Sequence, residues 1–245
     1  MLNILVPLSV QSMFFESSDY PFPKPLIEID GKPMIQHLVE NLSTIAGAKR
    51  FIFVLRDEDC SRYHLDSTVR LLAGNDSIII RLLNQTKGAA CSALLAIDHI
   101  GNDEPLLIVN GDQVFDLDLN LLLTRFRTMG SDAGCLTFDS VHPRWSYVRL
   151  EGEHDIVETA EKHPISRHAI AGFYYFARGA DFVLAAQHSI RKDTSVDDVY
   201  YIAPVLNELV LLNRKLTALS IPNAAYHTFY SPKKIEEYEA RRQLR

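Results

Sequence analysis

The sequence predicts an α/β fold with a mixed, mostly parallel sheet flanked by helices, and three observations lead to this prediction. Short apolar runs, typical of strands buried on both faces, recur along the first half of the chain. Segments with apolar residues at helical spacing separate these runs, which is the alternation expected of βαβ units. No linker, repeat or low-complexity stretch divides the 245 residues, so residues 1–245 are predicted to form a single domain.

The first half of the chain alternates between strands and helices. The apolar run from Asn3 to Leu8 predicts the first strand. Apolar residues then recur at helical spacing from Met34 to Ile45, directly after Pro33, a residue that suits the start of a helix. By the same criteria we predict strands over 50–55, 78–82 and 105–109, and helices over 63–72 and 89–100.

The second half of the chain has a different character, with several strand-like segments before the late helices. A mixed sheet with an antiparallel portion is therefore expected there. We predict strands over 133–140, 146–150, 157–160 and 172–176, and helices over 181–189, 201–211 and 234–245.

Composition favours a globular protein that binds small ligands. Apolar residues make up 47% and charged residues 23%, enough for a large core and a solvated surface. The formal charge of −6 and the pI near 5.8 argue against a nucleic-acid partner, because phosphate backbones are held by clustered Lys and Arg. A small phosphate-bearing substrate remains compatible, since a local group of N–H donors and one lysine can bind it.

The cysteines and the N-terminal segment exclude further classes. Cys60, Cys91 and Cys135 have no close spacing, so neither a metal pair nor a disulfide framework is predicted. The apolar segment from Met1 to Val6 has no basic region before it and meets Pro7 at once, which is typical of neither a signal peptide nor a membrane span. A cytoplasmic location without a membrane partner is expected, and a homo-oligomer is compatible with the sequence.

Polar residues at the carboxyl ends of strands are the first candidates for a site, because ligands of open α/β sheets bind there. Lys24 lies between two prolines, which limit where its ammonium group can travel; it suits a phosphate, and a solvated loop lysine is an equal alternative. Asp112 follows a buried strand, where it suits a Mg²⁺ ion held together with phosphate oxygens. An Asp that forms a turn with its own backbone is the alternative.

The segment from Gln85 to Ala90 joins a strand to a helix rich in small residues. The N–H groups at the start of that helix can face a base or a phosphate, and Gln85 can contact a base edge. An ordinary tight turn with an N-terminal cap is the alternative, and it is favoured when this motif is taken alone.

Four weaker candidates have structural alternatives that the sequence alone favours or leaves equal. The Asp116-Leu117-Asp118 triplet resembles the Asp-x-Asp of glycosyltransferases, but a surface turn is the favoured reading. Trp145 is a pocket residue or a core filler, and Glu161 with Lys162 is a ligand-binding charge pair or solvated surface. Asp197 and Asp198 provide either a carboxylate near the metal or a helix cap.

Taken together, these segments resemble the sugar-phosphate nucleotidyltransferases in residue type and in order, over most of the chain. The resemblance begins with Val6-Pro7-Leu8 and the run from Tyr20 to Ile35. It continues through Gln85 to Ala90, Asn110 to Gln113, His142 to Ser146, Ala160 to Lys162 and Gly172 to Tyr175.

The resemblance implies a Rossmann-like fold of the nucleotide-diphospho-sugar transferase type and a defined reaction. A nucleoside triphosphate is joined to a sugar phosphate or a similar small phosphate, which gives pyrophosphate and a nucleotide-activated product of the kind used in polysaccharide biosynthesis. It implies that Lys24 and Asp112 are catalytic and that Asp112 ligates Mg²⁺. It places Leu8, Ser9, Gln85, Gly88, Ala89 and Gly111 at the nucleotide, and Trp145, Glu161, Lys162 and Gly172 at the acceptor.

Two segments depart from the pattern of this family. After the first strand the family has Gly-x-Gly-x-Arg, whereas this chain has Val10, Ser12 and Phe14 at the two glycines and the arginine. A side chain at Val10 crowds an approaching phosphate, and Phe14 offers no charge. Near the C-terminus the family has a Gly-Thr-Pro turn, often after a carboxylate of the metal site, whereas this chain reads His227-Thr228-Phe229-Tyr230-Ser231-Pro232.

Three functions therefore stay open at this point. The first is a nucleotidyltransferase with altered or reduced activity. The second is a catalytically silent relative that binds a nucleotide or a nucleotide sugar in a regulatory or partner role. The third is a glycosyltransferase of the same fold that uses Asp112.

Overall fold

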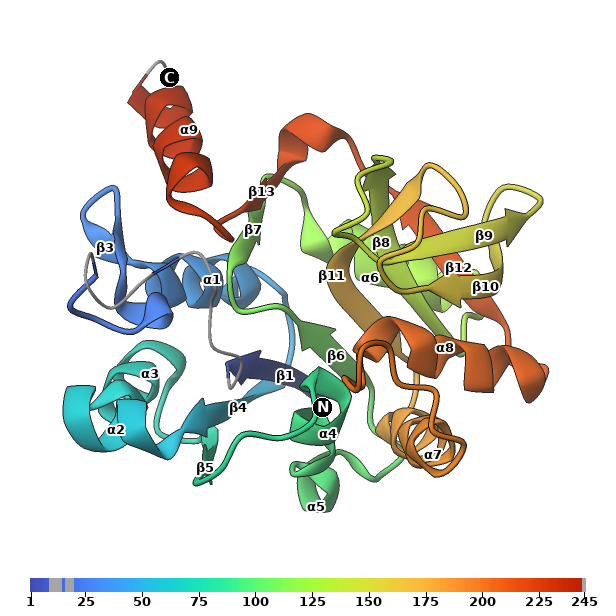
Figure 1. Cartoon of the computed structure of the whole chain (residues 1–245), viewed down its shortest axis with the longest axis horizontal. Coiled ribbons are helices and arrows are strands. Elements are labelled where there is room, and N and C mark those ends of the chain that lie inside the picture. Colours follow the sequence, from blue (N-terminus) through green and yellow to red (C-terminus); the bar gives the residue numbers. More distant parts are fainter. Residues whose placement is uncertain (9–14, 16–19, 244–245) are drawn as a thin grey trace.

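A nine-stranded mixed sheet forms the centre of the protein (Figure 1). The computed structural model describes residues 1–8, 15 and 20–243. The strand order is β5-β4-β1-β6-β11-β8-β12-β10-β9. The strands are β1 (Leu2–Leu8), β4 (Lys49–Arg56), β5 (Ile78–Leu82), β6 (Leu106–Val109), β8 (Ala133–Asp139), β9 (Tyr147–Glu151), β10 (Asp155–Ala160), β11 (His168–Phe176) and β12 (Leu216–Ser220).

The direction of the strands divides this sheet into two halves. Strands β5, β4, β1 and β6 run parallel, so their carboxyl ends meet at one edge. Strand β11 is antiparallel to both β6 and β8, and β10 is antiparallel to both β12 and β9, while β12 runs parallel to β8. The predicted α/β fold with a mixed sheet is confirmed.

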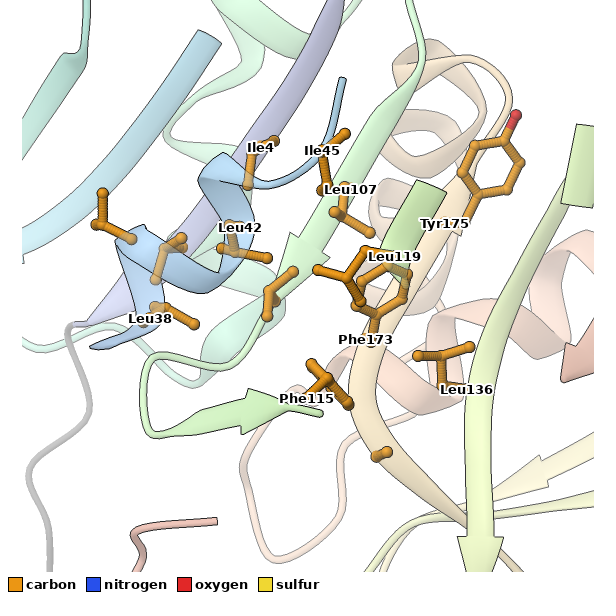
Figure 2. Packing of buried hydrophobic residues seen from close by; sticks show 14 of the residues in the cluster. Ile4, Leu38, Leu42, Ile45, Leu107, Phe115, Leu119, Leu136, Phe173 and Tyr175 are labelled. Atoms are coloured by element: carbon orange, nitrogen blue, oxygen red, sulfur yellow. The ribbon is translucent and has the colours of Figure 1, made fainter. Parts of the chain in front are cut away.

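Helices cover both faces of the sheet, which makes three layers (Figure 1). On β1, Ile4 and Val6 pack with α1, α3 and α6, whereas Leu5 packs with α4, α5, α7 and α8 on the other face, as the alternation of a strand requires. Figure 2 shows part of the first core, in which residues of α1 and α6 meet Leu107 and Phe173 of the sheet. The helices are α1 (Met34–Ser43), α2 (Asp57–Tyr63), α3 (Leu65–Ala73), α4 (Ala89–Leu94), α5 (Ile97–Ile100), α6 (Leu119–Thr128), α7 (Gly179–Arg191), α8 (Ile202–Leu211) and α9 (Pro232–Gln243).

Short elements outside the sheet bring the C-terminal part of the chain toward its middle. Strand β7 (Gln113–Phe115) pairs antiparallel with β13 (Tyr226–Thr228), and β2 (Glu28–Ile29) pairs with β3 (Lys32–Pro33). Two 3-10 helices, η1 (Lys24–Leu26) and η2 (Asn223–Ala225), complete the elements of the described part of the chain. Within that part, no helix is both long enough and apolar enough to traverse a bilayer.

Several elements differ from the prediction. The helix expected over 89–100 is divided into α4 and α5, and the sequence did not predict α2, α6, β12 or the short strands β2, β3, β7 and β13. Helix α6 starts at Asp118, whose Oδ1 accepts hydrogen bonds from the backbone N–H groups of Asn120 at 2.9 Å and Leu121 at 3.4 Å. Asp118 is therefore the cap of a helix, a structural role other than the surface turn that the sequence favoured for the Asp-x-Asp triplet.

Candidate active site

The carboxyl edge of the parallel strands gathers several predicted site residues. Leu8 is the last residue of β1, and Gly111 lies just beyond β6, the neighbour of β1 in the sheet. A Cβ on Gly111 would collide with the end of the Leu8 side chain, so a larger residue there requires that side chain to move. Ser9, Val10, Ser12 and Phe14 lie outside the described residues.

Lys24 and Asp112 form the ion pair at this edge. Lys24 begins η1, where Pro23 precedes it and the Leu26 N–H donates to the Pro23 carbonyl over 2.8 Å, so its backbone is fixed by the turn. The distance from Lys24 Nζ to Asp112 Oδ2 is 2.5 Å, and the two side chains are 21% and 24% exposed. The ring of Phe15 lies 5.6 Å from the same ammonium group. Lys24 and Asp112 are therefore direct neighbours, and their catalytic roles stay predictions.

The turn that precedes α4 is held by hydrogen bonds to the segment that precedes α8. The Tyr200 N–H donates to the Lys87 carbonyl over 2.7 Å, and the Ala90 N–H donates to the Tyr200 carbonyl over 3.0 Å. Gly88 lies between them with φ +119°, and Gln85, earlier in the turn, is exposed. The turn places Ala89, the first residue of α4, at the wall of a cavity.

This cavity, of about 240 Å³, lies between the carboxyl edge of the parallel strands and the antiparallel half of the sheet. Five of the predicted site residues line it: Ala89, Asp112, Trp145, Glu161 and Gly172. Lys162 is not among its described lining residues. Its Nζ lies 3.1 Å from Asp197 Oδ2 and 5.2 Å from the centre of the Tyr201 ring, and Tyr201 does line the cavity. The cavity therefore brings the predicted metal ligand together with three of the four predicted acceptor residues.

Glu161 is a partly buried carboxyl group in the wall of the cavity. Burial raises its pKa to about 7, and the hydrogen bond from the Ser146 hydroxyl and the charge of Lys162 oppose that rise. The phenol of Tyr174, another wall residue, also has a raised pKa, because it is buried and because Glu161 lies nearby. At neutral pH this part of the cavity can therefore either donate or accept hydrogen bonds.

Replacing Glu161 by glutamine is expected to stabilise the protein at about pH 8 by about 2 kcal/mol and to have little effect near pH 5. The pKa of Glu161 is about 7 in the folded protein and 4.5 as its ordinary value, so the folded state binds the proton more tightly than the unfolded state. The stability that protonation of Glu161 gives the folded state is fully present below pH 4.5 and is lost as the pH rises through 7. Urea unfolding at both pH values measures the difference, with Glu151→Gln at an exposed position of β9 as the control. Equal stability of Glu161→Gln and wild type at both pH values would contradict this account.

Gly172 has a clear structural requirement for glycine. It lies in an irregular stretch of β11 with φ +61°, and a Cβ there would collide with the Asn110 side chain and lie 2.8 Å from Gln113 Oε1. Its carbonyl accepts hydrogen bonds from the Asn110 N–H at 2.9 Å and from Gln113 Nε2 at 2.8 Å. Gly172 thus ties β11 to the segment that carries Asp112, and its contact with an acceptor stays a prediction.

The oxygen ligands around Asp112 fit a magnesium ion only in part. Strand pairing places Thr228 opposite Gln113, and the Phe229 N–H donates to the Asp112 carbonyl over 2.7 Å, so the C-terminal segment lies beside Asp112. Thr228 is neutral, and the described residues contain no group of three or more His, Cys, Asp or Glu placed to hold a metal ion. A single carboxylate binds Mg²⁺ when substrate phosphates supply further oxygen ligands.

Several wall residues were not predicted. Arg144, Tyr226 and Tyr230 line both this cavity and a second one of about 360 Å³ that extends toward α9. Arg144 lies in the segment between β8 and β9, next to the predicted Trp145, and its basic character was visible in the sequence. Tyr226 and Tyr230 belong to the segment that β13 carries back to the site, and no local pattern indicates such a return.

Comparison with known proteins adds evidence that the geometry alone does not contain. The model of the family described as "Nucleotidyl transferase" matches residues 20–206. The UTP–glucose-1-phosphate uridylyltransferase AglF of Haloferax volcanii is 26% identical over 204 residues, which are 81% of this chain and 79% of that protein.

Solved structures have the same fold at lower identity. A nucleoside-diphosphate-sugar pyrophosphorylase from Vibrio cholerae RC9 matches with a TM-score of 0.82 and 22% identity, covering 98% of this chain and 100% of that one. A UDP-glucose pyrophosphorylase complexed with UDP-glucose matches with a TM-score of 0.76 and 17% identity, covering 100% of both chains. At these identities the structures support the fold alone, and the match to the family over residues 20–206 decides the assignment. This chain belongs to the nucleotidyl transferase family.

Proposed function

We propose that this protein joins a nucleoside triphosphate to a sugar phosphate or a similar small phosphate and releases pyrophosphate. The observation that carries the proposal is a single cavity that contains Asp112 beside Lys24 and also Trp145 and Glu161. A nucleotidyltransferase has to hold a phosphate-rich donor next to a hydroxyl-rich acceptor, and this cavity offers charged groups for the first and mixed aromatic and polar groups for the second. Membership of the family and the likeness to sugar-phosphate enzymes support the same reaction.

In the proposed reaction, an oxygen of the sugar phosphate attacks the α-phosphorus of the triphosphate in line. The bond between the α-phosphorus and the bridging oxygen breaks, and pyrophosphate leaves with that electron pair. Lys24 is proposed to offset the negative charge on the phosphates, while the turn around Gln85, Gly88 and Ala89 holds the nucleotide. Glu161 is proposed to bind acceptor hydroxyls, and Trp145 to pack against the acceptor.

Magnesium is proposed to bind at Asp112 together with phosphate oxygens of the substrate. The ion would supply charge neutralisation for the phosphates. Lys24 already pairs with Asp112 at 2.5 Å, so lysine and ion share one carboxylate. This arrangement, together with the neutral Thr228 beside it, favours a reaction that is slower than that of a site with two carboxylates.

The same observations favour one alternative, a relative that binds a nucleotide sugar without catalysis. A carboxylate neutralised by lysine, with a threonine next to it, can hold phosphates yet stabilise a transition state poorly. The departures at Val10, Ser12 and Phe14, which are visible in the sequence, point in the same direction. A direct assay separates the two functions.

The assay measures pyrophosphate release by the purified protein. Each reaction contains Mg²⁺, one of the common nucleoside triphosphates, and one phosphate from a panel of sugar 1-phosphates and other small phosphates. We expect release with at least one pair, dependent on both substrates. Reactions without the acceptor phosphate are the control, because they report simple hydrolysis of the triphosphate.

Absence of pyrophosphate with every pair would contradict the proposed catalysis. If nucleotide sugars nevertheless raise the melting temperature, the binding relative is the better description, since a ligand that binds only the folded state stabilises it. Transfer of a sugar from a nucleotide sugar without pyrophosphate would instead favour a glycosyltransferase.

A further inference from the structure

Ser146 lies where three strands of the antiparallel half of the sheet meet at the wall of the cavity. It precedes β9, whose first residue, Tyr147, pairs with Ala160 of β10 on one side and with Ala169 of β11 on the other. The Ser146 carbonyl accepts a hydrogen bond from the Ile170 N–H over 2.8 Å. The backbone at Ser146 is therefore held from both sides, and Ser146 lines the cavity from a fixed position.

The register of these strands makes Ser146 and Glu161 neighbours. Glu161 follows Ala160, the last residue of β10, so the same register places it opposite Ser146. Side chains that lie opposite each other on paired strands are close enough to interact, and the Ser146 hydroxyl donates a hydrogen bond to Glu161 Oε2. Both residues are partly buried and line the cavity. The wall of the cavity thus holds one oxygen of the Glu161 carboxyl group.

Ser146 is the residue that orients this carboxyl group. Among the residues that the structure describes, it is the side chain that donates a hydrogen bond to Glu161. Lys162 is the next residue in the chain, but its ammonium group pairs with Asp197 at 3.1 Å. The long side chain of a glutamate has several rotatable bonds, and a ligand that has to order such a side chain loses affinity. The hydrogen bond from Ser146 orders the Glu161 side chain before a ligand arrives.

We propose that Ser146 is a positioning residue of the sugar site, which acts by holding the Glu161 carboxyl group in the orientation that binds a hydroxyl of the sugar. This inference rests on the proposed function, in which Glu161 binds acceptor hydroxyls, and it names the residue on which that contact depends. The ligand is a nucleotide sugar or the sugar phosphate from which it forms. Its phosphates are proposed to lie at Lys24 and Asp112, so Ser146 is expected to affect the affinity for the sugar and not the affinity for the nucleotide.

The test measures calorimetric affinities for UDP-glucose, dTDP-glucose and GDP-mannose in the presence of Mg²⁺, each beside the nucleoside diphosphate that it contains. For the nucleotide sugar that wild type binds most tightly, we expect Ser146→Ala to weaken binding about 3- to 10-fold, because the ligand then has to order the Glu161 side chain itself. The affinity for the corresponding nucleoside diphosphate should stay unchanged. Ser146→Thr keeps a hydroxyl at this position and is expected to bind both ligands as wild type does.

Two controls separate positioning from a general effect on the fold. The matched control is Ser166→Ala, which removes a hydroxyl that donates to the Val148 carbonyl over 2.6 Å, and it is expected to leave both affinities unchanged. The second control adds Ser146→Ala to Glu161→Ala. The nucleotide-sugar affinity of Glu161→Ala should not fall further, because no carboxyl group remains for Ser146 to position.

Several results would overturn the role of Ser146. These are an unchanged nucleotide-sugar affinity of Ser146→Ala, an equal loss for the nucleoside diphosphate, an equal loss in Ser146→Thr, and a further loss when Ser146→Ala is added to Glu161→Ala. A melting temperature of Ser146→Ala within the range of Ser166→Ala excludes misfolding as the cause of a weaker affinity.

The outcomes also distinguish this inference from the proposed function. The expected losses in a protein that releases no pyrophosphate would support Ser146 and contradict the catalysis. A wild type that binds each nucleotide sugar no more tightly than its nucleoside diphosphate would overturn the role of Ser146, whereas pyrophosphate release by that same protein would leave the proposed reaction standing.

Discussion

Replacing Gly88 by alanine is expected to lower the free energy of unfolding by about 4 kcal/mol. Gly88 precedes α4 with φ +119° and ψ 174°, a backbone region that is accessible almost only to glycine. A Cβ there would collide with the backbone carbonyl of Tyr200 and lie 2.8 Å from its nitrogen. That backbone is held by two hydrogen bonds, one to Lys87 and one from Ala90, so it has little freedom to move.

The control for this prediction is Gly130→Ala, which isolates the contribution of the backbone angle. Gly130 also has a positive φ, +64°, but an added Cβ would meet nothing within 4 Å. It is expected to cost about 1 kcal/mol. Urea unfolding followed by circular dichroism measures the free energy of unfolding of both variants. In the extreme form of the expected result, Gly88→Ala does not fold whereas Gly130→Ala does. Equal losses in the two variants would show that the contact with Tyr200 has no energetic weight.

The sequence predicted the fold well where a pattern is local. The apolar run at 78–82 has the bounds of β5, because a buried strand needs little more than consecutive apolar residues between polar turns. Strand β12 and helix α6 were not predicted. Leu216–Ser220 mixes apolar residues with Thr217 and Ser220, and it is a strand because β8 and β10 lie beside it.

The site was predictable only where the sheet itself brings residues together. Lys24 and Asp112 lie in the segments that follow β1 and β6, which are parallel neighbours in the sheet. Segments that follow parallel strands meet at the carboxyl edge, and this rule needs no knowledge of long-range contacts. Arg144, Tyr226 and Tyr230 come from the antiparallel half and from the segment after β12. The pairing of β13 with β7 joins residues more than a hundred positions apart, and such pairings leave no local signal in the sequence.

The structure contradicts the helix cap proposed for Asp197 and Asp198, since Tyr201 caps α8, while their role near a metal stays a prediction. The sequence proposed a metal carboxylate or a helix cap for Asp197 and Asp198. Both instead have left-handed backbone angles in a tight turn between Val196 and Val199, where Asp197 pairs with Lys162. This pairing holds the ammonium group of Lys162 beside the ring of Tyr201, at the rim of the cavity.

Replacing Lys24 by glutamine is expected to reduce the kcat/KM of pyrophosphate release about 100-fold or more, an effect of about 3 kcal/mol on the transition state. The ammonium group offsets charge on the phosphates in the proposed reaction, whereas the glutamine side chain is one bond shorter and carries no charge. The matched control is Lys32→Gln, which breaks an exposed ion pair with Glu40 at 2.8 Å and is expected to leave the rate unchanged. Initial rates at varied triphosphate concentration measure both variants.

Asp112→Asn and the double variant with Lys24→Gln then separate catalysis from stability. The two side chains are about three-quarters buried, so each single variant leaves an unpaired charge, and each is expected to lose about 1–2 kcal/mol of unfolding free energy. The double variant is expected to lose less than the sum, because neither charge remains. Its rate of pyrophosphate release should be as low as that of either single variant. The second substitution removes the unpaired charge and so restores stability, but it does not restore the contact with the phosphates. A double variant with the rate of wild type would mean that the ion pair serves the fold alone, and that the phosphates are held by other residues of the cavity.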